Sequence, residues 1–185
     1  MKKSKKIIII LLVCTAVFSL VFFAGRSILK NIFPIGYSEY VEKYCKEYKV
    51  DKAFMYALIK TESDFKADAV SSVGAEGLTQ ILPETKEWLC MRAGEKLNNI
   101  SLFDSETSVK YGTFLVSLLL EEFGGNYETV AAAYHAGIGI VGKWLENPEY
   151  SSDGRSLKKI PYDDTRYYVE KIISTEKIYK SLYHF

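Results

Sequence analysis

The sequence predicts a mainly α-helical protein, in which one N-terminal transmembrane helix precedes a single folded domain. Beyond residue 36 the apolar residues recur at helical spacing, and glycine or proline separates the segments that they define. No segment alternates between apolar and polar residues as a half-buried strand does. The length of 185 residues suits one domain with an appendage.

Residues 7–24 form an uncharged, almost wholly apolar run. As a helix the run is about 27 Å long, close to the hydrocarbon thickness of a bilayer. Only basic charges precede it, and the positive-inside rule places these in the cytoplasm (Lys2, Lys3, Lys5 and Lys6). We therefore expect residues 1–6 in the cytoplasm, 7–24 as an uncleaved single-pass anchor, 25–36 as a connector and 37–185 as an extracytoplasmic domain.

A cleaved signal peptide is the alternative interpretation of this run. The run is longer than a typical signal core, and no small-x-small cleavage site follows it directly, which favours the anchor. Both interpretations place the domain outside the cell.

The charge and the number of possible metal ligands argue against two classes of function, nucleic-acid binding and metal binding. From residue 25 onward 20 basic side chains stand against 23 acidic ones, without a basic stripe, which argues against a nucleic-acid partner. Three cysteines without a C-x-x-C pair, and only two histidines, argue against a zinc or iron–sulfur site. Cys45 and Cys90 either form a disulfide or serve as small buried residues, and their spacing leaves both interpretations open.

The first half of the domain is expected to hold three helices. Tyr37–Tyr48 carries apolar and aromatic residues at helical spacing. Asp51 is an expected N-cap for a helix through Ser63, in which one stripe (Phe54, Met55 and Leu58) faces the core. A loop with Gly74 and Gly77 leads to a short helix over Pro83–Met91.

The second half is expected to hold three more. Ser105 is the expected N-cap of a long helix with a broad apolar face, which Gly124 and Gly125 end. A helix over Tyr127–Tyr134 and a last one over Asp164–Tyr183 follow.

Glu62 is the candidate catalytic residue. It follows Phe54 and Leu58 by eight and four positions, so it projects from the face of the helix that enters the core. Desolvation and the nearby helix C-terminus both disfavour its charge, and so they raise its pKa. A carboxyl that stays protonated near neutral pH suits a general acid. The alternatives are a glutamate turned to solvent or one paired with an arginine.

Four blocks of the sequence carry a family resemblance. Residues 57–65 read A-L-I-K-T-E-S-D-F, 71–83 read S-S-V-G-A-E-G-L-T-Q-I-L-P, 131–139 read A-A-A-Y-H-A-G-I-G, and 161–169 read P-Y-D-D-T-R-Y-Y-V. In this order they resemble the blocks of the soluble-lytic-transglycosylase (SLT) family, which is related to goose-type lysozyme. The resemblance covers about residues 37–183 and implies a lysozyme-like domain that cuts the glycan strands of peptidoglycan.

The resemblance also implies a role for single residues. Glu62 would be the single catalytic acid/base, and the substrate-binding residues would be Ser63, Gln80, Tyr134, His135 and Tyr168. Tyr134 would hydrogen-bond near Glu62 or line the sugar site, and Tyr168, preferred to Tyr167, would close the cleft beside Glu62. The structural alternatives are a hydroxyl bonded to the backbone for Ser63, a loop-stabilising amide for Gln80 and a core tyrosine for Tyr134. The glycines of these blocks are expected to serve backbone conformation (Gly74, Gly77, Gly137 and Gly139).

Two positions depart from the family pattern. Thr79 stands where methionine is usual, and we expect it to shorten a side chain of the pocket wall. His135 stands where asparagine is usual, and it would add a titrating group near the site. Both affect the expected specificity and leave the acid in place.

The reaction that the resemblance implies needs neither a metal nor an organic cofactor. Glu62 would protonate the bond between N-acetylmuramic acid and N-acetylglucosamine, and the muramic acid C6 hydroxyl would then attack to leave a 1,6-anhydro end. If Asp68 or Glu76 instead positions a water, the protein would be a hydrolytic muramidase. A glycan-binding envelope scaffold without activity is the further alternative. The expected partners are the glycan strands and the membrane.

Overall fold

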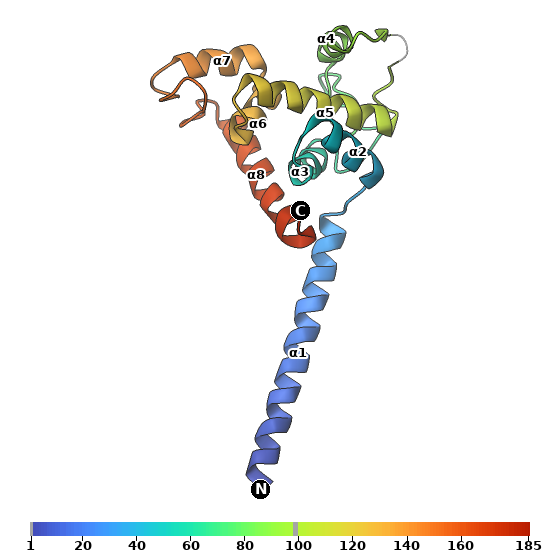
Figure 1. Cartoon of the computed structure of the whole chain (residues 1–185), viewed down its shortest axis with the longest axis vertical. Helices are drawn as coiled ribbons and strands as arrows, with labels where there is room; N and C mark the ends of the chain where they lie inside the picture. The colour runs from blue at the N-terminus through green and yellow to red at the C-terminus, as the bar shows by residue number, and fades with distance from the viewer. Residues whose placement is uncertain (1, 98–99) are drawn as a thin grey trace. The chain divides into compact units, whose positions relative to one another are not determined.

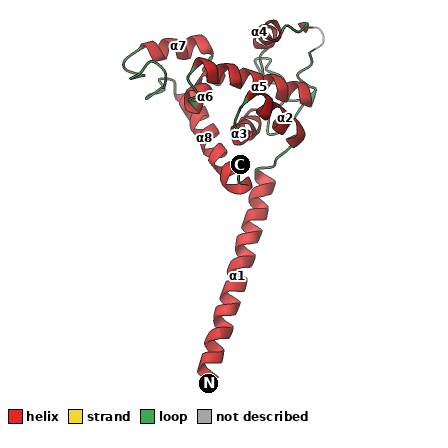
Figure 2. Cartoon of the chain, viewed as in Figure 1, coloured by secondary structure: helices red, strands yellow, loops and turns green. Residues whose placement is uncertain are grey.

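The computed structural model describes residues 2–97 and 100–185, without the side chains of residues 2–5 and 7. Helices make up its regular structure (Figures 1 and 2), and within this described part the extended segments meet only in isolated bridges. The chain divides into two compact units, one ending at Pro34 and the other running from Ile35 to Phe185. The prediction of a mainly α-helical protein is confirmed.

The first unit is the helix α1, which spans Lys2–Ile32. Its stretch Ile8–Ile32 has a mean hydropathy of 2.8, so by length and composition it is able to cross a membrane. The helix does not end near Ala24, and residues 25–32, which were expected in a connector, are helical. No helix breaker occurs between Gly25 and Pro34, and the residue before a proline disfavours helix, which explains where α1 ends. Met1 of the expected cytoplasmic segment lies outside the described residues.

The second unit is built around α3 (Lys52–Glu62). As predicted, Asp51 caps this helix, and its carboxylate accepts hydrogen bonds from the backbone N–H of Ala53 at 2.7 Å and of Phe54 at 3.2 Å. The expectation of one apolar stripe is wrong, because every residue from Ala53 to Ile59 is buried. A helix that is apolar all round belongs in the middle of a domain.

Four other helices pack around α3 or complete the core. α3 packs chiefly on α8 (Asp163–Tyr183), α2 (Ser38–Tyr48) packs on α5 (Ser105–Glu122), and α6 (Tyr127–Ala136) packs on both α5 and α8. Figure 1 shows α5 crossing the second unit, with α8 running along its side.

Several boundaries differ from the expected ones. Asp104 caps α5, because its carboxylate accepts from Thr107 N at 2.9 Å, so the prediction that Ser105 is the cap is wrong. α4 spans Pro83–Ala93 and ends at Gly94, whose φ of 69° is the left-handed conformation that glycine tolerates. The helix α7 (Ile138–Glu146) was not predicted, because it contains two glycines and follows directly on α6.

Cys45 and Cys90 are both buried and free, which favours their interpretation as small buried residues over a disulfide. Burial raises the pKa of the Cys45 thiol to about 12, so this thiol stays protonated and behaves as an apolar side chain.

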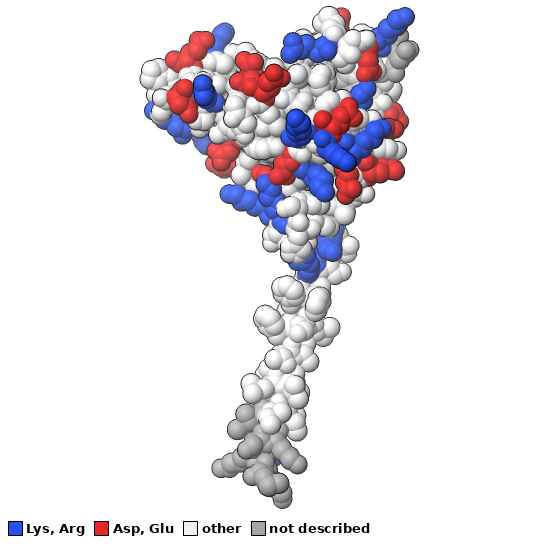
Figure 3. Space-filling view, in the orientation of Figure 1, with Lys and Arg blue, Asp and Glu red and all other residues white. Residues whose placement is uncertain are grey.

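On the face shown in Figure 3, acidic and basic side chains are interspersed over the second unit.

Candidate active site

Glu62 and Tyr168 meet at the centre of the site. Glu62 is the last residue of α3, and the hydroxyl of Tyr168 on α8 donates a hydrogen bond to its Oε1. Tyr168 is 8% exposed, whereas its neighbour Tyr167 is 69% exposed. Tyr168 therefore contacts the carboxyl, and Tyr167 is exposed to solvent.

Burial governs the titration of this carboxyl. It raises the pKa of Glu62 from 4.5 to about 7, although the Tyr168 hydrogen bond and the positive charge of Lys171 act in the opposite direction. A substantial fraction of the Glu62 carboxyl is therefore protonated at neutral pH. Burial and the neighbouring Glu62 also raise the pKa of Tyr168, so its hydroxyl remains a donor.

The loop after α3 is tied to the end of that helix. The hydroxyl of Ser63 is buried and hydrogen-bonded to backbone carbonyls, with Leu78 O at 2.8 Å and Ile59 O at 3.2 Å. The side-chain amide Nε2 of Gln80 donates to Ala69 O at 3.1 Å and to Gly77 O at 2.9 Å. Both donors of that amide are used within the loop, which leaves its carbonyl oxygen for a ligand.

Gly77 fixes the same loop against the start of α5. Its φ is +75°, and a Cβ added there would lie 2.0 Å from the backbone oxygen of Leu102. Only glycine accommodates this combination of a left-handed backbone and close contact with another backbone. The glycine-rich block therefore serves the backbone path at this position.

Thr79 does not line a pocket, so the expectation of a shortened wall residue is wrong. Its side chain is fully buried, and its hydroxyl bonds Ser108 O at 3.0 Å. A Cβ on Gly112 of α5 would lie only 2.4 Å from Thr79 Cγ2, so the threonine packs directly on the backbone of α5. Only the backbone oxygen of Thr79 reaches the site, where it accepts from Tyr134 OH at 2.6 Å.

Tyr134 and His135, at the end of α6, line a cavity, and His135 also contacts Tyr168. The ring centroid of His135 lies 4.6 Å from that of Tyr168, and its Nδ1 lies 3.2 Å from Thr165 Oγ1. The cavity has a volume of about 350 Å³. Four helices and the turn before α4 form it, through Leu82, Glu84, Thr85, Trp88, Leu115, Leu119, Ala133, Tyr134, His135, Ala136, Gly137 and Ile138. Glu62 does not line this cavity; it is linked to it through Tyr168, whose ring contacts the cavity residue His135.

The α4 side of the cavity and Thr165 were missed by sequence reasoning. Trp88 on α4 was the available signal, since tryptophan is highly buried on average and usually packs against other residues. Thr165 precedes Tyr168 by three positions in the block of residues 161–169, so both lie on one face of α8. This spacing could have predicted that Thr165 lies near the site.

The other carboxylates near Glu62 in the sequence are engaged or exposed. Glu76 lies 3.9 Å from Lys86, Asp64 pairs with Lys60, and Asp68 is exposed. Within residues 2–97 and 100–185 no group of three or more His, Cys, Asp or Glu side chains has the arrangement of a metal site.

The fold and the site together define a lysozyme-like helical domain, in which a tyrosine that contacts the cavity lining holds one half-buried carboxyl. The chain belongs to the transglycosylase SLT domain family, whose model matches residues 39–155.

Among its relatives is the soluble lytic murein transglycosylase of Escherichia coli (strain K12), 29% identical over 160 residues, which cover 82% of this chain and 24% of the relative. The membrane-bound lytic murein transglycosylase C of Serratia proteamaculans (strain 568) is 26% identical, covering 78% of this chain and 46% of the relative. The chain thus spans between a quarter and half of the length of these relatives.

Solved structures resemble the same part of the chain. An inactive variant of the lytic transglycosylase Slt from Pseudomonas aeruginosa, with one glutamate changed to glutamine, superposes with a TM-score of 0.71 at 28% identity, over 80% of this chain and 24% of that one. The 70-kDa soluble lytic transglycosylase from Escherichia coli gives a TM-score of 0.72 at 26% identity, over 83% of this chain and 25% of that one.

Proposed function

We propose that the protein is a peptidoglycan lytic transglycosylase with Glu62 as its single acid/base. The observation that carries the proposal is the half-buried Glu62 carboxyl, with a pKa raised to about 7 and a hydrogen bond from Tyr168, in a domain of the SLT family. The relative that a glutamate-to-glutamine change inactivates supports an essential glutamate in this family.

In the proposed reaction Glu62 first acts as an acid. Its proton goes to the glycosidic oxygen between N-acetylmuramic acid and N-acetylglucosamine, and the bond from that oxygen to the anomeric carbon breaks. The Glu62 carboxylate then takes the proton of the muramic acid C6 hydroxyl, whose oxygen bonds the anomeric carbon to close a 1,6-anhydro ring. The starting protonation state of Glu62 is restored, and no water is consumed.

The neighbouring side chains have distinct parts in this proposal. Tyr168 orients Glu62 and stabilises its carboxylate form through the hydrogen bond that it donates. Tyr134 and His135 line the cavity in which the sugar would bind. Gln80 offers its carbonyl oxygen to the glycan, and Ser63 supports the site by fastening the loop to α3.

The products of digestion test this chemistry. The full-length protein in detergent is incubated with purified peptidoglycan, and the released fragments are analysed by mass spectrometry. We expect muropeptides with 1,6-anhydromuramic ends, which are about 18 Da lighter than those with reducing ends because no water is added. Reducing ends would instead identify a hydrolytic muramidase, and would turn attention to Asp68 and Glu76. Binding without any cleavage would identify the scaffold.

We also propose that α1 anchors the protein in the membrane, with the second unit on the extracytoplasmic side. Its apolar stretch Ile8–Ile32 and the relative named membrane-bound support this. We expect the protein to stay with the membrane fraction after carbonate extraction, and a protease added outside intact protoplasts to degrade the second unit. Recovery in the soluble fraction, or a mature N-terminus near residue 25, would contradict an uncleaved anchor.

A further inference from the structure

The α4 side of the cavity is held by few apolar contacts. Of its eleven residues only Leu89 and Cys90 are buried, and Met91 is 68% exposed. The same helix supplies Glu84, Thr85 and Trp88 to the cavity lining. A wall with so little burial needs other contacts to hold it in one place.

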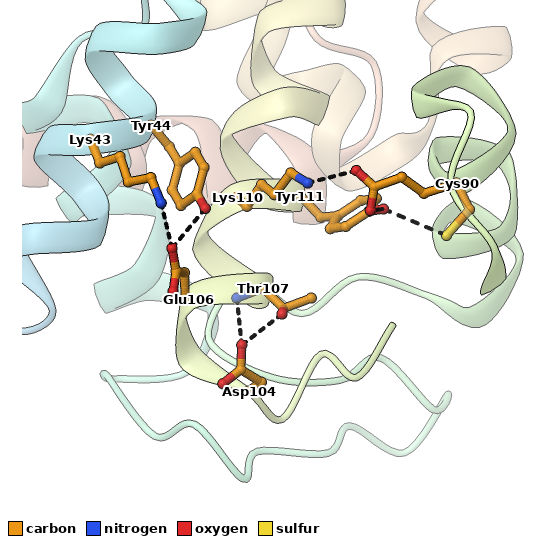
Figure 4. A network of polar contacts seen from close by, with 9 residues as sticks. Lys43, Tyr44, Cys90, Asp104, Glu106, Thr107, Lys110 and Tyr111 are labelled. Carbon is orange, nitrogen blue, oxygen red and sulfur yellow. Dashed lines mark hydrogen bonds and ion pairs between the residues drawn. The ribbon is translucent and has the colours of Figure 1, made fainter. Parts of the chain in front are cut away.

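Glu95 provides such a contact at the end of α4. Its backbone N–H donates to Cys90 O at 3.0 Å, which fixes Glu95 to the last turn of the helix. Its carboxylate accepts from two side chains of α5, Lys110 Nζ at 2.6 Å and Tyr111 OH at 3.0 Å (Figure 4). The carboxylate therefore joins α4 to α5, the helix whose Leu115 and Leu119 line the same cavity.

Tyr111 makes this contact specific. Its side chain is buried, and its hydroxyl also receives a weak hydrogen bond from Cys90 Sγ of α4, at 3.9 Å. Burial raises the pKa of Tyr111, so the hydroxyl stays protonated and donates to Glu95. The Lys110 ammonium lowers the pKa of Glu95, so the carboxylate stays charged.

A second cluster of the same chemistry lies at the start of α5 and supplies a matched control. Glu106 accepts from Lys43 Nζ at 2.6 Å and from Tyr44 OH at 2.9 Å, as Figure 4 also shows. This cluster joins α5 to α2, and none of its three residues lines the cavity.

We infer that Glu95, through Lys110 and Tyr111, is a positioning residue that sets the place of the α4 wall and thereby the affinity of the cavity for its ligand. The effect on glycan affinity rests on the proposed function, whereas the effect on the α4 wall does not. Glu95 does not line the cavity that Tyr134 and His135 line, and it takes no part in the chemistry, so its loss should weaken binding and leave the catalytic step in place.

The position of α4 is measured through Trp88. The chain has two tryptophans, so the change Trp144→Phe leaves Trp88 as the only one. In full-length protein with this background, we expect Glu95→Gln and Tyr111→Phe to raise the acrylamide quenching constant of Trp88 about twofold, because a displaced α4 exposes the indole. Glu106→Gln should leave it unchanged. The inference is overturned if quenching does not respond to Glu95→Gln, or if Glu106→Gln has the same effect.

The affinity is measured with the tetrasaccharide of two N-acetylglucosamine–N-acetylmuramic acid repeats, in Glu62→Gln protein so that the probe stays intact. We expect Glu95→Gln to raise the Kd about tenfold, and in protein with Glu62 to raise KM similarly with kcat changed less than about twofold. If Glu95→Gln lowers kcat as much as it raises KM, or if Glu106→Gln raises the Kd as much as Glu95→Gln does, Glu95 has only a general stabilising role. If unmodified protein neither binds nor cuts the probe, the proposed function fails, and the quenching series still decides the role of Glu95.

Discussion

Replacing Glu62 with glutamine is expected to lower kcat on peptidoglycan by at least about 10³-fold, the upper range for removal of a general acid. Glutamine keeps the shape of the side chain and still accepts the Tyr168 hydrogen bond. Its amide cannot donate a proton to the glycosidic oxygen, as the Glu62 carboxyl with its raised pKa would. Release of anhydromuramic fragments over time measures the effect. Asp64→Asn is the matched control, because Asp64 lies two positions later, is exposed and pairs with Lys60, so its loss should leave kcat within about twofold.

The same variant should fold into a more stable protein at alkaline pH. The folded-state pKa of Glu62 lies above its unfolded value, so the wild-type protein loses stability as pH rises from 4.5 to about 7, and glutamine removes this loss. We expect Glu62→Gln to be more stable by roughly 3 kcal/mol at pH 8, with no such gain at pH 4. Lost activity with lower stability at both pH values would show misfolding, and would not support a role as the acid.

The rate is expected to fall tenfold for each unit of pH above about 7. In the proposed reaction the free protein needs a protonated Glu62 for the first step. The pKa of Glu62 is about 7, so kcat/KM should be level on the acidic side of that value and fall on the alkaline side. Initial rates of fragment release between pH 5 and 9 give this profile. A rate that increases through pH 7 would mean that Glu62 must be ionised, and would contradict its role as the acid.

Tyr168 and Lys171 give this profile an internal test. Both favour the carboxylate form, and therefore each lowers the pKa of Glu62 relative to what burial alone would give. Tyr168→Phe and Lys171→Met should both move the alkaline limb to higher pH. An unmoved limb in both variants would assign the titration to a different group.

The helical class and the candidate Glu62 could be predicted from the sequence because both depend on local patterns. Asp51 stands directly before the apolar run of α3, and the spacing from Phe54 to Glu62 follows the helix period, so the cap and the direction of the carboxyl were readable. The order of the four sequence blocks was enough to predict the family. The hydrogen bond between Tyr168 and Glu62 was not predicted, since helix geometry does not pair α3 with α8. The resemblance placed Tyr168 at the cleft and Tyr134 as the hydrogen-bonding residue near Glu62, whereas Tyr134 bonds Thr79 O.

The remaining features depend on contacts between distant segments. Thr79 was expected on a pocket wall, but it packs on α5 in the space left by the missing side chain of Gly112. No residue near Thr79 in the sequence indicates this contact. The α4 wall likewise depends on Glu95 meeting Tyr111, across residues that have no periodic relation. Gly139 and Gly142 concealed α7, because intrinsic propensity disfavours helix there and tertiary packing overrides it.

The bond between Tyr168 and Glu62 also links activity to folding order. Its two partners are 106 positions apart, so this contact closes a long loop and has a high contact order. Until α8 has packed on α3, the Glu62 carboxyl lacks both the burial that raises its pKa and the hydroxyl that orients it. A partly folded chain therefore carries an ordinary solvated glutamate, and under the proposed function the protein would acquire its acid only as its fold is completed.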